Sequence, residues 1–414
     1  MRIWLSTLVV AFIITHFPAA LLAEEPATAT GNVVDAAGNP VPHATVMVYS
    51  AGVKKGYSIF CPTCYRDCGK RSETGVDGNF AIGGLNPDLW FTLLVIKDGY
   101  SAAYIEKSDP AKGPAEATLK PRPAVEDLTQ VVRGNVVDVH GEPLKDAVVE
   151  QQGVTFKGPP GIGASFGPVD WIDQAAVTNA HGDFEIAYGK PAMKMILQVS
   201  ARGMAPKLFT EPTGAQRQTM AVTEGALIRG RLMYHGKPVA NAEVGLTSHG
   251  HGAGTVFPEV RIGTREDGTF AITNIPAGRI WLIYPKMESL ASRGIGAGAV
   301  PCETKDDGQE VDVGDIQLAP AYTFRGQIVL EDGKPVPPDM HVTLAADRGW
   351  DSQIAPISPD GRLEFHGLPA DIYNLMPAVK GYHLPEGSNP AAIVNRDVDN
   401  FVIGMELRRD LNPQ

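Results

Sequence analysis

Three cysteines lie within eight residues, and their spacing is the most concentrated chemical feature of the sequence. Cys61, Cys64 and Cys68 occur in the segment Cys-Pro-Thr-Cys-Tyr-Arg-Asp-Cys, and Cys302 lies far along the chain. Such spacing fits a disulfide, a redox pair or a thiolate metal site. Tyr65 follows Cys64 where covalent haem attachment needs a histidine, and a redox motif needs a βαβ pattern that this sequence lacks. A disulfide remains, as does a metal site with Cys302 as its fourth ligand.

Two short patterns match the spacing of hydrolase active sites. Residues 163–167 read Gly-x-Ser-x-Gly around Ser165, but a nucleophile elbow needs a strand before it and a helix after it. Prolines on both sides favour a flexible loop instead. His383 and Glu386 have the His-x-x-Glu spacing of zinc carboxypeptidases, but a zinc site needs a third protein ligand and no histidine follows. We therefore predict no catalytic residue in either segment.

Two histidines and four aromatic residues complete the candidates for ligand binding. His249 and His251 stand in a glycine-rich segment without a nearby carboxylate or cysteine, which favours a solvated loop over a metal site. Aromatic side chains in connections between strands are candidates for a platform that binds sugar. These ligand-contact candidates are Tyr57, Tyr65, Trp171 and Trp350. We predict no metal and no cofactor.

The N-terminus has the features of a secretory signal peptide. Arg2 precedes a long apolar run, and Ala23 stands immediately before acidic residues. We predict a signal peptide over residues 1–23, with cleavage after Ala20 or an uncleaved anchor as alternatives. No later segment is apolar for 18 residues, so we predict no membrane span after cleavage. The periplasm and the cell exterior are oxidising compartments, so export to either favours the disulfide. Which cysteines are paired stays open.

Composition excludes several classes of protein. The 414 residues include 36 Lys and Arg against 47 Asp and Glu, and the resulting charge of −11 argues against nucleic acid as a partner. With 43% hydrophobic and 20% charged residues, the chain does not have the composition of a disordered protein. Its length fits about two to four domains. Its 45 glycines and 33 prolines indicate many short strands joined by turns.

Two short signatures recur four times in the same order. The first is a glycine that opens a strand and leads to a Gly-x-Pro turn, and its copies lie 103, 96 and 96 residues apart. These leading glycines are Gly31, Gly134, Gly230 and Gly326. The second is Asp-Gly-x-Phe-x-Ile or a close variant, at residues 77–82, 181–186, 267–272 and 360–365. A period of this length is the size of a domain rather than of a solenoid unit.

The residues around these signatures alternate between apolar and polar types, as do strands with one buried face. Phe80 and Ile82 are predicted to point into a core while their neighbours face outward, and residues 242–247 alternate in the same way. About seven short strands per repeat predict two facing sheets. The predicted fold class is therefore all-β, with four tandem immunoglobulin-like or transthyretin-like β-sandwich domains after the signal peptide. The repeats, numbered 1 to 4 below, are predicted to span residues 24–124, 125–224, 225–320 and 321–414.

Together these motifs resemble the carboxypeptidase regulatory-like domain, a family with a transthyretin-like β-sandwich. In that family a Gly-Tyr pair ends a later strand, and Lys97–Tyr100 and Val379–Tyr382 match it here. Repeat 2 matches loosely at Ala201–Met204, and repeat 3 has Tyr284–Met287 at this place instead. The resemblance covers nearly all of the mature chain. It implies a non-catalytic domain that accompanies enzymes, receptors or surface proteins, and it transfers no catalytic residues.

These observations predict an exported, non-catalytic, multidomain protein that binds or has a structural role. Its expected partner is a cell-envelope protein or a polysaccharide. We expect any affinity to come from the insertions at residues 50–75 and 157–177, because these segments differ most between the repeats. The alternatives are a carbohydrate-binding cell-envelope protein and a hydrolase with its site in a loop insertion. No nucleophile beside a base and no complete set of metal ligands supports the hydrolase.

Overall fold

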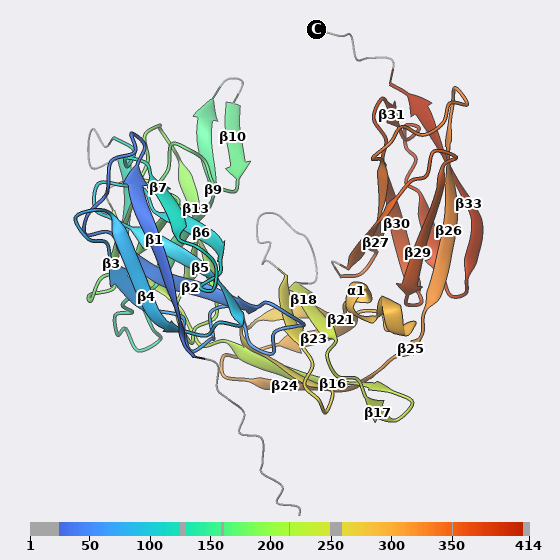
Figure 1. The fold of residues 1–414 in the computed structure, drawn as a ribbon, viewed down its shortest axis with the longest axis horizontal. Helices are drawn as coiled ribbons and strands as arrows, with labels where there is room; N and C mark the ends of the chain where they lie inside the picture. The colour runs from blue at the N-terminus through green and yellow to red at the C-terminus, as the bar shows by residue number, and fades with distance from the viewer. Residues whose placement is uncertain are drawn as a thin grey trace, which may run out of the picture.

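The computed structural model describes residues 25–124, 130–158, 161–214, 216–248, 259–349 and 351–408. Within these ranges the chain is almost entirely β-strand, which confirms the predicted all-β class (Figure 1). The predicted signal peptide, residues 1–23, lies outside them, as do His249, His251 and Trp350. None of the helices in the described ranges is both long and apolar enough to cross a membrane.

Repeat 1 forms two facing sheets around a hydrophobic core. Its strands are β1 (Ala27–Asp35), β2 (Thr45–Val53), β3 (Arg71–Glu73), β4 (Asn79–Leu85), β5 (Leu89–Ile96), β6 (Ala103–Ser108) and β7 (Ala115–Leu119). One sheet has the order β4-β1-β7 and the other the order β3-β2-β5-β6. Phe80 and Ile82 of β4 are buried and the residues between and before them are exposed, so the predicted alternation is confirmed.

Repeat 2 repeats this arrangement and adds a long hairpin. Its strands are β8 (Val131–Val137), β9 (Val148–Gly158), β10 (Gly161–Phe166), β11 (Ala175–Val177), β12 (Asp183–Ala187), β13 (Lys194–Ser200), β14 (Lys207–Pro212) and β15 (Arg217–Ala221). The sheets have the orders β12-β8-β15 and β10-β9-β13-β14, with β11 also paired to β9. The prediction of a flexible loop around Ser165 is wrong. Ser165 lies in β10, because the long strand β9 offers its backbone groups partners, with Val154 opposite Ser165.

Repeat 3 has two main sheets and two short helices. Its strands are β16 (Ala226–Tyr234), β17 (Lys237–Pro238), β18 (Glu243–Ser248), β19 (Val260–Gly263), β20 (Thr269–Ile275), β21 (Arg279–Pro285), β22 (Ile295–Gly296), β23 (Val300–Thr304), β24 (Glu310–Gln317) and β25 (Ala319–Pro320). The helix α1 (Met287–Leu290) and the 3₁₀ helix η2 (Ala291–Arg293) follow β21. The sheets are β17-β16-β20, with β24 on β16, and β19-β18-β21-β23, and β22 pairs with β25.

Repeat 4 has two four-stranded sheets. Its strands are β26 (Tyr322–Leu330), β27 (His341–Ala346), β28 (Ser352–Pro356), β29 (Arg362–Leu368), β30 (Asp371–Ala378), β31 (Tyr382–His383), β32 (Ala391–Val394) and β33 (Val398–Leu407). The sheet orders are β29-β26-β33-β31 and β28-β27-β30-β32. In every repeat the first strand pairs in parallel with the last long strand, as β1 with β7, β8 with β15, β16 with β24 and β26 with β33.

The recurring signatures meet in the first sheet of each repeat. A Cβ atom on Gly31 would lie 2.5 Å from the ring of Phe80 and 2.2 Å from the carbonyl oxygen of Ala115. These separations are shorter than a van der Waals contact, so only glycine fits between the parallel partner strand and the aromatic ring. The pairs Gly134 with Phe184 and Gly230 with Phe270 repeat this contact. The spacing of the two signatures therefore reflects one packing contact that is used again.

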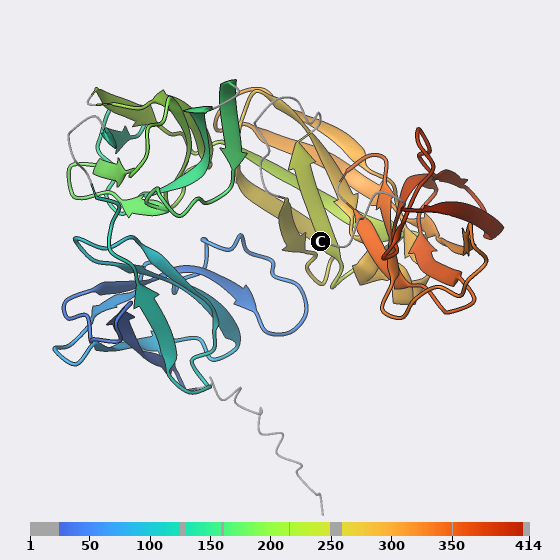
Figure 2. The ribbon, with the colours of Figure 1, turned by 90° about the horizontal axis from the view of Figure 1, so that it is seen from above.

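The repeats are arranged around an open curve. Figure 1 shows repeats 1 and 2 on one side, repeat 3 across the base and repeat 4 on the other side. Seen from above in Figure 2, repeats 1 and 2 lie side by side and repeat 4 stands at the far end of repeat 3. Strand pairing within the described ranges stays inside each repeat. Contacts between repeats are therefore made by side chains, loops and helix α1.

Candidate functional site

The cysteine segment contains the predicted disulfide. Cys61 and Cys64 are bonded, with their Cα atoms 5.2 Å apart. Cys68 is a free thiol in the core of repeat 1, where burial raises its pKa to about 11. Cys302 is a free thiol in the core of repeat 3, where burial raises its pKa as well. Because these two thiols lie in different cores, the structure does not form the alternative metal site with Cys302 as a ligand.

The same segment connects repeat 1 to repeat 3. The backbone N–H of Gly263 in β19 donates to the carbonyl oxygen of Ser58 at 2.5 Å. A Cβ atom on Gly263 would lie 2.8 Å from the Cβ of Tyr57, so the two backbones approach closely. Cys64 Sγ lies 3.9 Å from Thr273 Oγ1 of β20. The insertion that was predicted to bind a partner is therefore engaged, over part of its length, with another repeat of the same chain.

The aromatic candidates have three different environments. Tyr65 is 7% exposed and contributes to the core of repeat 1, and its hydroxyl contacts Ser58 Oγ. Tyr57 is half-buried against repeat 3, and burial raises its pKa. Trp171 is half-buried in repeat 2, with its ring edge-on to Phe156 at 6.3 Å between centroids. The structure does not bring these three side chains together into one exposed surface.

The hydrolase-like segments also lie apart. Ser165 is on a strand of the β9–β10 hairpin, which has no helix after it. His383 is in β31, and its Nδ1 lies 2.7 Å from the carbonyl oxygen of Leu384. Within the described ranges, no three His, Cys, Asp or Glu side chains gather in a way that would hold a metal ion.

The interface between repeats 1 and 2 combines an apolar centre with buried polar groups. The apolar residues are Met47, Leu94, Ala102, Val148 and Ala175. Glu150 of β9 accepts hydrogen bonds from the hydroxyls of Tyr49 at 3.1 Å and Tyr104 at 2.6 Å. Burial, together with the Glu150 charge, raises the pKa of both tyrosines, so both remain donors. Strands β2 and β6 of repeat 1 thus both contact one carboxylate of repeat 2.

Charged pairs close the edges of this interface. Arg71 makes a bidentate contact with Asp146, at 3.0 Å and 2.9 Å. Arg122 Nε donates to Asp173 Oδ2 at 2.6 Å, and Ser101 Oγ donates to Asp173 Oδ1 at 2.8 Å. Planar guanidinium–carboxylate pairs specify orientation as well as distance. These contacts therefore define one orientation of repeat 2 on repeat 1.

Repeats 2 and 3 meet at a short, closely packed junction. Asn274 Nδ2 donates to the carbonyl oxygens of Gly203 at 2.8 Å and Glu224 at 3.0 Å. Thr223 Oγ1 donates to Asp307 Oδ1 at 2.7 Å. A Cβ atom on Gly225, the first residue of repeat 3, would lie 2.6 Å from the Cβ of Ala205 in repeat 2. The junction has no long linker that would let the two repeats rotate freely.

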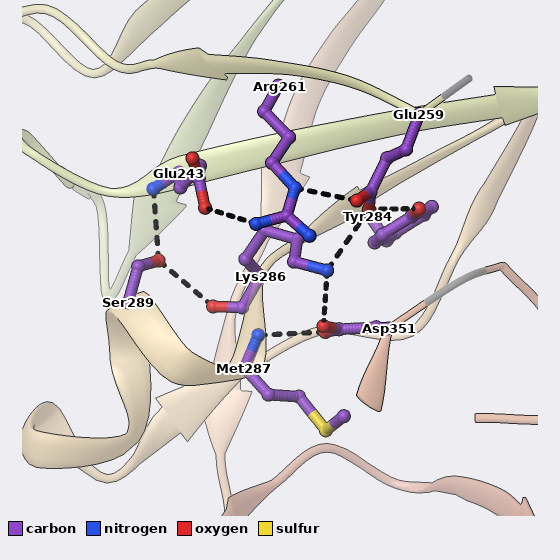
Figure 3. Close-up of polar contacts among 8 residues, drawn as sticks. All are labelled: Glu243, Glu259, Arg261, Tyr284, Lys286, Met287, Ser289 and Asp351. Atoms are coloured by element: carbon purple, nitrogen blue, oxygen red, sulfur yellow. Dashed lines mark hydrogen bonds and ion pairs between the residues drawn. The ribbon is translucent and has the colours of Figure 1, made fainter. Parts of the chain in front are cut away.

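The boundary between repeats 3 and 4 encloses a charged cluster (Figure 3). Lys286 is 3% exposed, and its Nζ lies 3.0 Å from Glu259 Oε1 and 3.0 Å from Asp351 Oδ1 of repeat 4. The backbone N–H of Met287 donates to Asp351 Oδ2 at 2.8 Å. Burial raises the pKa of Asp351, and the positive charge of Lys286 opposes that rise. One buried cation thus joins carboxylates from two repeats.

Glu259 is the best satisfied carboxylate of this cluster. Tyr284 Oη donates to its Oε1 at 2.6 Å and Arg261 Nε donates to its Oε2 at 2.6 Å. Burial alone would raise the pKa of Glu259, but the hydrogen bonds and the Lys286 charge outweigh it and leave the pKa lowered. Glu259 therefore holds a negative charge beside Lys286.

The cluster explains two departures of repeat 3 from the predicted pattern. The sequence predicts that Gly245 and Thr247 face outward, and this prediction is wrong because both residues are buried. The ring of Tyr284 would lie 2.6 Å from a Cβ atom on Gly245 and covers that face. Where the Gly-Tyr element is missing, α1 forms, and Met287 reaches into the core of repeat 4. Repeat 3 is modified where it meets its neighbour.

No protein-family model matches this chain, and no curated protein matches it. Among solved structures, the Bacillus anthracis TIE protein aligns with 12% identity over 93% of this chain and 75% of that chain, with a TM-score of 0.21. A streptococcal ancillary pilin aligns with 12% identity over 68% and 100%, with a TM-score of 0.25. BcpA, the major pilin subunit of Bacillus cereus, aligns with 11% identity over 72% and 100%, with a TM-score of 0.19. Similarity at this level supports no inference about what this chain does.

Proposed function

We propose that this chain is an exported, non-catalytic protein that binds or has a structural role, and that its four β-sandwich domains are held in one fixed arrangement. The domains would span residues 24–124, 125–224, 225–320 and 321–414, after a signal peptide at 1–23. The motifs that resemble the carboxypeptidase regulatory-like domain support a non-catalytic role, since that family transfers no catalytic residues.

The observation that carries the proposal is the buried Lys286 between two carboxylates at the boundary of repeats 3 and 4. Independent domains on flexible linkers would keep such charges in water. Burying an ion pair gains little net stability, because desolvation offsets the attraction, but a broken pair is costly. We take the cluster as a device that specifies one orientation of the two domains. The contacts of Asp173 and Asn274 would do the same at the other two boundaries.

The described residues give less support to the alternatives. A hydrolase needs a nucleophile beside a base, and Ser165 lies on a hairpin strand of repeat 2, whereas His383 lies in repeat 4. A sugar platform needs exposed rings, and Tyr65 is in the core while Tyr57 packs on repeat 3. Among the described residues, Ser165 and His383 belong to different repeats, and neither Tyr57 nor Tyr65 is exposed.

A distance measurement between the ends of the molecule tests the fixed arrangement. Val76 and Val402 are 84% and 59% exposed, so cysteines placed there can carry spin labels while the native free thiols stay buried. A fixed arrangement gives one narrow distribution of distances. The variant Lys286→Met should broaden it, whereas Lys305→Met, at an exposed lysine, should leave it narrow. A broad distribution in the unmodified protein would contradict the proposal.

An activity screen tests the non-catalytic role separately. Peptidase, esterase and glycosidase substrates should give no turnover above background. Reproducible turnover that disappears in Ser165→Ala or His383→Ala would replace this proposal with the hydrolase alternative.

A further inference from the structure

Two cavities lie between repeats 1 and 2, and the second of them lies beside the cysteine segment. Its volume is about 490 Å³. Its apolar wall includes Met47 and Val148, which belong to the interface cluster. Its polar wall carries five cationic side chains and one carboxylate, Asp146. The cations are Arg66, Lys70 and Arg71 of repeat 1, and Lys145 and Arg202 of repeat 2.

Only two of these cations have an acidic partner within the described ranges. Lys70 Nζ lies 2.5 Å from Asp67 Oδ1, and Arg71 is engaged by Asp146. Arg66, Lys145 and Arg202 make no ion pair with a described residue. Three exposed cationic residues thus line one cavity without a protein carboxylate paired to them, although the chain as a whole carries a charge of −11.

The neighbouring cavity at the same interface shows the opposite arrangement. It has a volume of about 640 Å³ and is lined by several arginines and carboxylates. There Arg122 pairs with Asp173, Arg133 with Glu185, and Arg217 with Asp183. Because the arginines of that cavity are paired with its own carboxylates, little net charge is left to attract a ligand. An unbalanced positive wall is therefore a property of the second cavity and not of the interface as a whole.

We propose that the second cavity binds a multiply charged anion, a ligand that carries two or more carboxylate, sulfate or phosphate groups. Arginine forks bind such oxyanions through two parallel hydrogen bonds, and a lysine adds a compact charge. Thr63 and Ser200 also line the cavity. The ligand would bridge the two repeats, because Arg66 comes from one and Arg202 and Lys145 from the other. This inference rests on the proposed binding role and names its ligand class.

Calorimetric titration of the full chain at low ionic strength tests the site. The probes are citrate, as a small carboxylate anion, and a sulfated hexasaccharide, as an anionic glycan, each compared with the desulfated hexasaccharide. We expect at least one anionic probe to bind and the neutral sugar not to bind. The triple variant Arg66→Gln, Lys145→Gln, Arg202→Gln should weaken binding at least tenfold, because it removes the three unbalanced charges while keeping polar side chains.

A second triple variant separates a site from general attraction. Lys120→Gln, Lys237→Gln and Lys380→Gln remove the same charge at exposed positions outside this cavity, so binding should change less than twofold. Absence of binding by both anionic probes would overturn the inference, as would equal weakening by the two triple variants. Either result would leave the fixed arrangement untouched if the distance distribution stays narrow, so the two proposals can fail separately.

Discussion

Lys286 of repeat 3 and Asp351 of repeat 4 form an ion pair of 3.0 Å in which both side chains are almost fully buried. The backbone N–H of Met287 holds the second oxygen of Asp351. A single carboxylate is therefore attached to both the side chain and the backbone of one short segment in the preceding repeat. Rotation of repeat 4 would break both contacts. It would also expose Met287, which belongs to repeat 3 but packs in the core of repeat 4.

Replacement of this lysine should be costly. Lys286→Met keeps the length of the side chain but leaves Glu259 and Asp351 buried without a cation, so we expect a loss of about 3–5 kcal/mol in the free energy of unfolding. Chemical denaturation measures it. Lys305→Met removes a lysine whose side chain is 65% exposed, and should change stability by less than about 0.5 kcal/mol. Similar effects of the two variants would mean that the buried pair is energetically unimportant.

Glycine at the first signature should be required by packing. Gly31→Ala places a methyl group 2.5 Å from the ring of Phe80. We expect the free energy of unfolding to fall by about 1–3 kcal/mol or more. Gly52 lies in the same repeat with no atom within 4 Å of the corresponding position, so Gly52→Ala is the matched control and should be close to neutral. Thermal unfolding of both variants is the measurement. A neutral Gly31→Ala would remove the packing explanation for the repeated signature.

The disulfide should support the contact between repeats 1 and 3. In Cys61→Ser, Cys64→Ser the segment loses its crosslink, so the Gly263 amide, which donates to Ser58, should exchange its hydrogen faster. The Thr264 amide donates to Ala242 within repeat 3 and should keep its protection. Hydrogen exchange read out by NMR distinguishes the two amides. Unchanged protection of Gly263 would show that the contact does not depend on the disulfide.

Stability should fall at alkaline pH through Cys68. Its thiol has a pKa of about 11 in the folded protein, because burial disfavours the thiolate, against about 9 when exposed. The folded state therefore holds more protons than the unfolded state in this window. The contribution is complete below about pH 9 and is lost as pH rises towards 11. We expect a loss of about 1–2 kcal/mol in the free energy of unfolding by pH 10.5, since one pKa unit corresponds to about 1.4 kcal/mol and the folded thiol has begun to titrate there.

Urea unfolding at pH 8 and pH 10.5 checks this in the Cys61→Ser, Cys64→Ser background, which prevents thiol–disulfide exchange. Adding Cys68→Ala should reduce the loss between the two pH values by about 1–2 kcal/mol. The rest of the loss is expected from tyrosines whose pKa burial also raises, Tyr49, Tyr104 and Tyr373. An unchanged loss would assign the alkaline effect to other groups.

Much of the fold could be predicted from local patterns. The alternation around Phe80 predicts a strand with one buried face, and β4 is such a strand. The two signatures predict the repeats, and in each repeat the strands pair only with strands of the same repeat within the described ranges. The flexible loop that the prolines predict around Ser165 is wrong, because nothing local to Ser165 shows that strand β9 extends far enough to pair with it. Pairing partners outside a sequence window are invisible to a local pattern.

The candidate sites were harder to predict for the same reason. Neither carboxylate that pairs with Lys286 is close to it in the sequence, because Glu259 lies 27 residues away and Asp351 lies in the next repeat. One signal was present, namely the loss of the Gly-Tyr element at Tyr284–Met287, which marked repeat 3 as different where it meets repeat 4. Arg66, Lys145 and Arg202 are scattered along the chain, and only the docking of repeats 1 and 2 brings them to one cavity.

The parallel pairing of the first and last long strands has a mechanical consequence. Adjacent parallel strands place the entry and the exit of each repeat at opposite ends of one sheet. A pull on the two ends of the chain would then act along β1 and β7, and along β26 and β33, in opposite directions. All hydrogen bonds of such a ladder carry the load together instead of opening one after another. Under such a pull, each repeat would give way only when its whole ladder shears.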